Sequence, residues 1–167
     1  RPGELLGLQR RDIIIMDNGP TFLRVDRQWN QKTQPPSYTR PKAGSEREVI
    51  VPRFLVPTLT RHMDDHVGES AQSPLFPAQR NPRNPLSHNS YRQAWNRAVD
   101  AANLPPYVLH SLRHLGLSLL AVVGATESEV MEMGGHRDRE VASQYQHTLR
   151  DRPLELSERV GEQWVKQ

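Results

Sequence analysis

Proline and glycine divide the second half of the chain into short helical segments. A Pro-Pro pair at 105–106 ends any helix before it, and apolar residues at helical spacing begin again near His110. Gly124 ends that segment. A Thr-Glu-Ser-Glu run at 126–129 then has the pattern of a capping box, and the helix that it starts would end at the Gly-Gly pair at 134–135. The sequence therefore predicts two short helices joined by a tight turn.

Polar side chains with related chemistry lie at the ends of these segments. His110 and Arg113 are three positions apart, so they share one face of the first helical turn. The free N–H groups and the positive dipole end of a helix also favour an anion there. These features predict an anion clamp suited to phosphate. His136 follows the end of the second helix, and Tyr145 lies late in a third helix that Asp138 can cap.

β-branched and aromatic runs in the first half predict a small antiparallel sheet. The runs at 13–15 and 21–25 are separated by Asp-Asn-Gly-Pro at 17–20, which is a strong turn signal and indicates a hairpin. A third strand is expected over 46–51, after a segment rich in Pro and basic residues. The three strands would form one antiparallel sheet.

Amphipathic runs predict the remaining helices. A short helix opens the chain, with Pro near its first turn and with Leu5 and Leu8 on one face. Helical spacing over 54–67 and 89–102 predicts two more helices that each bury an apolar face. The chain between them is rich in Pro, Asn and Arg and is expected to be a surface loop. The expected fold class is α+β, mostly helical with a small three-stranded antiparallel sheet.

Composition narrows the class of protein further. The 167 residues suffice for one domain with a proper core, and the absence of Cys excludes disulfides and thiolate metal sites. A formal net charge of +3 permits a polyanionic partner without requiring one. The longest apolar run is too short to span a bilayer, and no signal peptide is recognisable. We therefore expect a cytoplasmic protein with no membrane partner.

Three motifs together resemble the active-site half of the tyrosine recombinases, the phage integrase family. They are a His-x-x-Arg motif ending at Arg113, a Gly-His pair ending at His136, and a Tyr-Gln-His run starting at Tyr145. Arg113 and His136 are 23 positions apart, and His136 and Tyr145 are 9 apart, as the family pattern expects. The closest resemblance is to integrases of actinobacterial phages and mobile elements.

The resemblance also covers the first residues of the chain. In the family, an Arg-x-x-Glu turn carries the first catalytic arginine, and Arg1 with Glu4 fits this position. This match implies that the chain starts within the catalytic domain, so that earlier helices and any separate DNA-binding domains would lie upstream. The residues alone also allow Arg1 to be an ordinary surface residue at a terminus.

A lysine on a turn of the small sheet completes the family pattern. Lys42, with Arg47 and Pro52 after it, fits the lysine that precedes a strand ending in Pro. Arg40 and Lys32 compete for the same assignment. The segment also reads as a solvated basic loop.

The resemblance implies DNA strand cleavage without a metal or any other cofactor. The implied catalytic residues are Arg1, Lys42, His110, Arg113, His136 and Tyr145. The arginines and histidines would neutralise charge that builds on the non-bridging phosphate oxygens. Tyr145 would attack to form a 3′-phosphotyrosyl bond, and Lys42 would protonate the leaving 5′ oxygen. The covalent bond stores the energy of the broken linkage, so rejoining needs no ATP.

The resemblance implies that the biological function is site-specific recombination, either integration or excision. The implied partner is double-stranded DNA at attachment or recombination sites, bound by a homo-tetramer in the bacterial cytoplasm and associated with the nucleoid. Residues 1–167 would form a single catalytic domain, truncated at its N-terminus. A terminal amphipathic helix within 152–167 would pack either on its own domain or on a neighbouring protomer.

Two readings from other classes stay open. A degenerate DNA-binding module would keep this fold and lose catalysis. A zinc enzyme would use His110, His114 and His136, although it lacks the Glu of a His-Glu-x-x-His motif. His62 and His66 also have metal-binding spacing, but no carboxylate or Cys stands at ligand spacing, so surface positions are expected.

Overall fold

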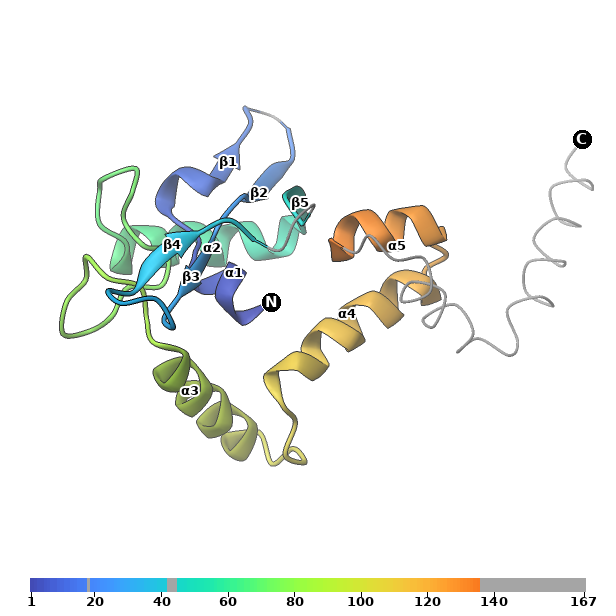
Figure 1. Ribbon diagram of the computed structural model, residues 1–167. Helices are drawn as coiled ribbons and strands as arrows, with labels where there is room; N and C mark the ends of the chain where they lie inside the picture. The colour runs from blue at the N-terminus through green and yellow to red at the C-terminus, as the bar shows by residue number, and fades with distance from the viewer. Residues whose placement is uncertain (18, 42–44, 136–167) are drawn as a thin grey trace, which may run out of the picture.

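The computed structural model describes residues 1–17, 19–41 and 45–135 (Figure 1). The helices are α1 (Pro2–Leu6), α2 (Val56–His66), α3 (His88–Ala101), α4 (Leu109–Val122) and α5 (Glu127–Gly134). The strands are β1 (Ile13–Ile15), β2 (Thr21–Val25), β3 (Gln28–Asn30), β4 (Ser37–Thr39) and β5 (Arg47–Val51). Short 3-10 helices, η1 (Arg10–Asp12) and η2 (Arg53–Leu55), precede β1 and α2. The expected helices from Asp138 onward and within 152–167 lie outside the described residues.

The three predicted strands form one antiparallel sheet in the order β1-β2-β5. In its register, Leu23 of β2 lies opposite Ile13 of β1 and Val49 of β5. Cross-strand pairs of branched side chains such as these stabilise a sheet. The prediction of a small three-stranded antiparallel sheet is confirmed. Strand β5 begins at Arg47, beside the end of α5.

A second sheet corrects the interpretation of the Pro-rich basic segment as a loop. Strands β3 and β4 pair as an antiparallel hairpin, with Trp29 directly opposite Tyr38 and their ring centroids 5.0 Å apart. Strands of three residues are too short to show alternation, and Pro35 and Pro36 conceal the pairing in the sequence. The aromatic pair supplies packing that no local propensity reveals.

Helix α1 is seated directly on this second sheet. A Cβ atom on Gly7, at the end of α1, would lie 2.7 Å from the Cα atom of Gln28 in β3. Only glycine permits this close approach of two backbones. The contact fixes the position of α1, and therefore of Arg1 at its N-terminal cap.

The larger core cluster joins the three-stranded sheet to α2 and to the loop after it. Its buried members are Leu8, Val25, Val67 and Leu75. Leu59 and Met63 of α2 and Phe76 of the loop pack against them, as the helical spacing predicts. Leu55 falls within the range 54–67 predicted as one helix, but it is 42% exposed because it belongs to η2, where the turn is tighter than in an α-helix.

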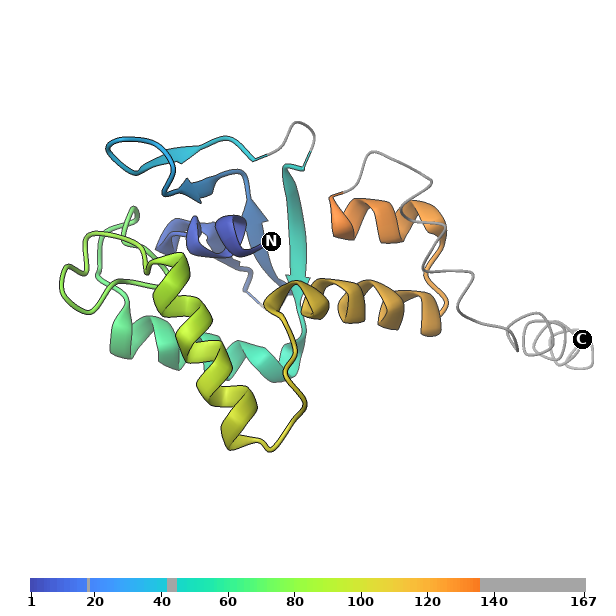
Figure 2. The ribbon, with the colours of Figure 1, turned by 60° about the horizontal axis from the view of Figure 1, so that its bottom comes forward.

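Helices α4 and α5 form a second packing unit beside the sheet (Figure 2). Leu117 and Ala121 of α4 are buried against Val130 of α5. The capping box predicted for α5 is present, since the Thr126 hydroxyl accepts from the Glu129 N–H at 3.3 Å. Within the described ranges, no helix is both long and apolar enough to cross a membrane.

Candidate active site

Arg1 lies where three parts of the fold meet. Its Nη1 atom donates to the Glu4 carboxylate at 2.6 Å and to the Ser45 hydroxyl at 2.7 Å. Its Nη2 atom donates to the carbonyl oxygen of Gly135 at 3.0 Å. Pro2 suits the first position of α1, where no N–H is needed, so the helix begins directly after Arg1. The guanidinium thus connects α1, the residues before β5 and the end of α5.

Glu4 is the buried acceptor at the centre of these contacts. Its side chain is 3% exposed and pairs with Arg1 on one side and Arg47 on the other, at 2.6 and 2.9 Å. Burial works to raise the pKa of Glu4. The positive charge of Arg47 and the hydrogen bonds from the guanidinium groups of Arg47 and Arg1 act against burial, and the pKa is lowered. Glu4 is therefore held as a carboxylate between two arginines.

Arg47, which in the sequence only supports the assignment of Lys42, is itself part of this site. Its side chain is 11% exposed. A signal for its burial exists in the sequence, because Arg47 is in phase with Val49 and Val51 on the inward face of β5. An arginine at such a position needs a buried partner charge, which Glu4 provides.

The first turn of α4 brings a histidine and an arginine to the same place. Arg113 donates through Nη2 to the carbonyl oxygen of Gly134. His110 is exposed and lies against His114, with ring centroids 4.9 Å apart. The pKa of His110 is lowered by desolvation of its ring and by the positive charges of His114, Arg113 and Arg1. The influence of both arginines on one imidazole shows that these groups share one electrostatic environment.

The end of α5 is the point at which both arginines converge. Gly135 adopts the left-handed conformation, with φ 59°, as its predicted place after the helix requires. The carbonyls of Gly134 and Gly135 accept from Arg113 and Arg1 respectively. Figure 2 shows this end of α5 directed toward β5 and α1. The geometry gathers a concentrated positive charge that suits a phosphate group.

A match between this sequence and a family profile, over most of the chain, identifies the family. The sequence profile described as the phage integrase family matches residues 1–152. The chain belongs to the phage integrase family. This finding confirms the resemblance to the tyrosine recombinases drawn from the motifs around Arg113.

Integrases of mycobacterial phages and prophages are among the similar proteins. An integrase of prophage phiRv2 from Mycobacterium tuberculosis (strain ATCC 25618 / H37Rv) is 33% identical over 158 residues, covering 94% of this chain and 41% of that protein. The integrase of Mycobacterium phage D29 is 30% identical over 166 residues, covering 97% of this chain and 43% of that protein. The chain therefore spans less than half the length of these relatives.

Solved structures of tyrosine recombinases share the fold. The Tn1549 transposon integrase, in complex with circular intermediate DNA, matches with a TM-score of 0.70 and 20% identity over 87% of this chain and 50% of that chain. The XerH site-specific recombinase, in its pre-cleavage complex with difH substrate, matches with a TM-score of 0.67 and 20% identity over 92% of this chain and 41% of that chain. These likenesses confirm the predicted fold class of this integrase-family chain.

The structure brings together three of the six residues assigned from the family resemblance. Arg1 and Arg113 contact the end of α5, and His110 lies near the start of α4, where desolvation and the charges of both arginines lower its pKa. Lys42, His136 and Tyr145 lie outside the described residues. Their roles therefore stay predictions for this member of the phage integrase family.

The two basic residues that competed with Lys42 are placed on the second sheet. Lys32 lies between β3 and β4, and Arg40 directly follows β4. Both are exposed. Ser45, two positions before β5 begins and three positions after Lys42, accepts a hydrogen bond from Arg1.

His62 and His66, which have metal-binding spacing but were expected at the surface, lie side by side on α2. His62 shares a hydrogen bond of 2.8 Å with the carbonyl oxygen of Leu75, and its ring lies 5.3 Å from those of His66 and Phe76. In the part of the chain that the structure describes, no group of three or more His, Asp or Glu side chains is placed to share a metal ion. These contacts fit a packing role for His62.

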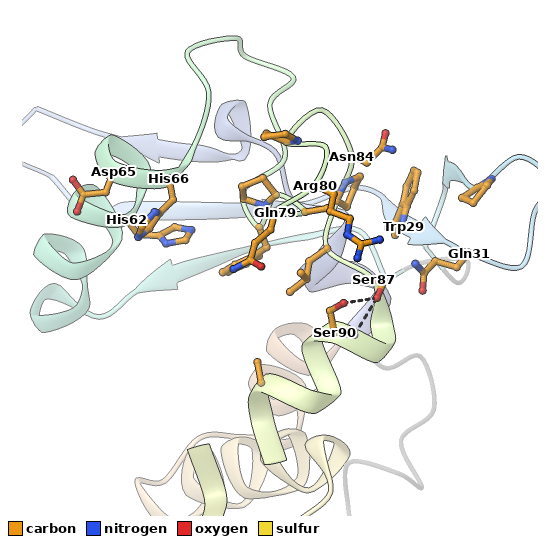
Figure 3. A pocket seen from close by; sticks show the side chains of 18 of the residues that line it. Trp29, Gln31, His62, Asp65, His66, Gln79, Arg80, Asn84, Ser87 and Ser90 are labelled. Atoms are coloured by element: carbon orange, nitrogen blue, oxygen red, sulfur yellow. Dashed lines mark hydrogen bonds between the residues drawn. The ribbon is translucent and has the colours of Figure 1, made fainter. Parts of the chain in front are cut away.

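A separate cleft of about 1050 Å³ lies between the β3–β4 hairpin, α2, the loop before α3 and α3 itself (Figure 3). Trp29, His62, Arg80 and Ser87 are among its lining residues. Figure 3 shows its polar side chains coming from several elements. Arg1, His110 and Arg113 do not line it, so this cleft is distinct from the cluster at the end of α5.

Proposed function

We propose that the protein containing this chain is a site-specific recombinase that cuts and rejoins DNA through a 3′-phosphotyrosyl intermediate. The observation that carries the proposal is the convergence of Arg1 and Arg113 at the end of α5, with His110 on the same helix as Arg113, three positions before it. Membership of the phage integrase family supports the same reaction class. The chemistry that follows is derived for a DNA phosphodiester at this cluster.

The arginines would stabilise the charge that develops during cleavage. Attack on a phosphodiester adds negative charge to oxygens that are already anionic, and two planar guanidinium groups can donate to them bidentately. A guanidinium carries five N–H groups, so Arg1 can keep its contact with Glu4 while it donates to phosphate. The Glu4 carboxylate holds Arg1 in place before DNA arrives, which reduces the cost of orienting it.

His110 would act as a further donor beside the arginines. Its pKa is lowered, so the neutral imidazole is favoured more strongly than in an isolated histidine. A neutral imidazole still has one N–H group for a phosphate oxygen. His136, which follows Gly135 in the sequence, would supply a second imidazole from the same turn.

Tyr145 and Lys42 would carry the bond-making and bond-breaking steps. A tyrosine hydroxyl has an unperturbed pKa of about 10, so Tyr145 needs a positive field to become a good nucleophile. Its hydroxyl would give its proton to a base, for which His147 is the candidate, and its oxygen would attack phosphorus and displace the 5′ oxygen of the next nucleotide. The Lys42 ammonium would give that oxygen a proton. In the reverse step a 5′ hydroxyl attacks the phosphotyrosyl bond and rejoins the strand.

Double-stranded DNA is the proposed partner, and a homo-tetramer on DNA is the proposed assembly. The matched Tn1549 integrase and XerH structures are themselves complexes with DNA. We further propose that the protein acts on DNA in the bacterial cytoplasm, without metal or ATP. The segment 152–167 would pack either on its own domain or on a neighbouring protomer.

A covalent trap tests this function. The encoded protein that contains residues 1–167 is incubated with a nicked DNA site and a chelator, and protein–DNA adducts are separated on a denaturing gel. We expect an adduct that maps to Tyr145 and is absent from Tyr145→Phe. Tyr107→Phe is the matched control. The Tyr107 side chain is exposed, and the hydrogen bond from Trp95 goes to the backbone carbonyl of Tyr107, which the substitution keeps. An adduct that persists in Tyr145→Phe, or that needs a divalent metal, would contradict the proposal.

A further inference from the structure

The side chain of Arg47 joins three elements through three different nitrogen atoms. Its Nη2 atom donates to the Glu4 carboxylate of α1 at 2.9 Å. Its Nη1 atom donates to the carbonyl oxygen of Ser45, beside β5, at 2.8 Å. Its Nε atom donates to the carbonyl oxygen of Met133, in the last turn of α5, at 3.1 Å. One planar group therefore fixes α1, β5 and α5 relative to one another.

Burial makes this arrangement different from an ordinary surface ion pair. The Arg47 and Glu4 side chains are 11% and 3% exposed, whereas Arg24 and Glu48 on the same sheet are 49% and 49% exposed. An exposed pair contributes little because water and salt screen it. Loss of one member of a buried pair leaves the other charge without compensation. Loss of Arg47 should therefore destabilise the fold more than loss of Arg24.

Arg47 also presses against the turn that both arginines of the cluster contact. A Cβ atom on Gly135 would lie 2.9 Å from Nη1 of Arg47. The last carbonyls of a helix have no partner within the helix and carry partial negative charge. Arg47 takes the carbonyl of Met133, while Arg113 and Arg1 take those of Gly134 and Gly135. Each of three consecutive carbonyls thus accepts a hydrogen bond from a different arginine.

We propose that Arg47 is a positioning residue for strand cleavage. By holding the end of α5 against Glu4, it sets the separation at which Arg1 and Arg113 are presented to the phosphate. Its own donors are directed to protein oxygens, so it acts through the other two arginines. This inference rests on the proposed function, because it concerns the rate of the cleavage step.

A lysine cannot replace this geometry. Its single ammonium nitrogen carries the same charge but cannot reach acceptors on three elements in the plane of a guanidinium. The Arg47→Lys variant should keep the charge of the site and lose the spacing of the arginines. A small displacement of catalytic groups lowers the rate of a positioned reaction far more than it lowers binding.

The test separates the rate of cleavage from DNA binding. In the encoded protein, the rate of covalent adduct formation on a nicked site is measured at saturating DNA, together with the DNA concentration for half-maximal rate and the salt dependence of binding. We expect Arg47→Lys to lower the saturated rate by about tenfold or more, with half-saturation and salt dependence unchanged. Arg24→Lys, the exposed control on the same sheet, should behave as the unchanged protein.

Two outcomes would overturn the inference while leaving the proposed function intact. One is a saturated rate for Arg47→Lys equal to that of Arg24→Lys. The other is a loss confined to affinity with a shallower salt dependence, which would make Arg47 a direct phosphate contact. Failure of the unchanged protein to form an adduct would instead contradict the proposed function.

Glu4→Gln provides a second test, with all variants assayed at a temperature at which each of them is still folded. Glu4→Gln retains the shape of the side chain but removes the charge that Arg47 holds. If Arg47 acts through Glu4, the double variant should cleave about as slowly as the slower single variant. Rate losses that multiply across the two substitutions would show independent roles and contradict the proposal.

Discussion

Arg1 and Arg113 donate to neighbouring backbone carbonyls, those of Gly135 and Gly134. Two consecutive peptide units, joined at the Cα atom of Gly135, therefore determine how far apart the two guanidinium groups lie. The conformation of this turn depends on Gly135, whose φ of 59° is strained for other residues. Changes to the turn should affect both arginines together.

The first prediction concerns Gly135→Ala. The left-handed conformation and the 2.9 Å approach of Arg47 Nη1 to a new Cβ atom both oppose the substitution. We expect a loss of stability of about 1 to 3 kcal/mol, and slower adduct formation in the encoded protein. Thermal or urea denaturation measures the first effect, and the covalent trap measures the second.

Gly116→Ala is the matched control for this prediction. Gly116 lies within α4, and a Cβ atom there would meet nothing within 4 Å. Alanine in a helix interior is more stable than glycine by about 0.5 to 1 kcal/mol, so this variant should gain stability. Equal destabilisation by both substitutions would show that the end of α5 does not depend on the conformation of Gly135.

The second prediction concerns Arg113→Lys. The substitution keeps the charge but replaces a planar two-pronged donor with a point charge. We expect the rate of adduct formation to fall by about 10²-fold or more, as for the loss of a preorganised donor. Arg61→Lys, an exposed change on α2, should leave the rate unaltered. Near-normal cleavage by Arg113→Lys would reduce Arg113 to a structural contact of α5.

Local signals explain why the elements around the site could be predicted. The capping box from Thr126 to Glu129 and the glycine stop at Gly135 lie within a few residues of one another, and both occur in the structure. The strands at 21–25 and 47–51 are long enough to show their β-branched residues. Each of these patterns involves residues close together in the chain, so it can be recognised from the sequence alone.

Contacts between distant residues could not be found in the same way. Strands β3 and β4 are stabilised by the pairing of Trp29 with Tyr38 and by the close contact of α1 with β3 that Gly7 allows. The hydrogen bond from Arg1 to Gly135 spans almost the whole described chain. Arg47 alternates with Val49 and Val51 on one face of β5, which indicates its burial. Its three hydrogen-bond acceptors can be identified only from the packed structure.

The third prediction concerns the acid stability of the fold. The folded-state pKa of Glu4 is lowered from the ordinary value of 4.5. A carboxyl group of this kind contributes stability above its unfolded-state pKa and loses it as the pH falls through the folded-state pKa. The melting temperature of the encoded protein should therefore fall on acidification below about pH 4.5, and Glu4→Gln should lack this part of the fall.

Glu48→Gln serves as the control for acid stability. Glu48 pairs with Arg24 on the surface, and both side chains are 49% exposed, so screening by water leaves little stability to lose. Its melting temperature should follow the pH profile of the unchanged protein. A profile flattened as much by Glu48→Gln as by Glu4→Gln would contradict a special role for the buried carboxylate.

The last prediction uses salt to count phosphate contacts. A protein that neutralises phosphates releases counterions, so the logarithm of the binding constant falls with the logarithm of the salt concentration by about 0.9 for each phosphate contact on duplex DNA. If Arg113 contacts a phosphate, Arg113→Ala should make this slope shallower by about 0.9 in the encoded protein. Tyr145→Phe removes only a hydroxyl group and should leave the slope unchanged while it abolishes the adduct. Fluorescence anisotropy with a labelled duplex over a salt series measures both slopes. An unchanged slope for Arg113→Ala would mean that the guanidinium remains on the end of α5 and does not reach the DNA.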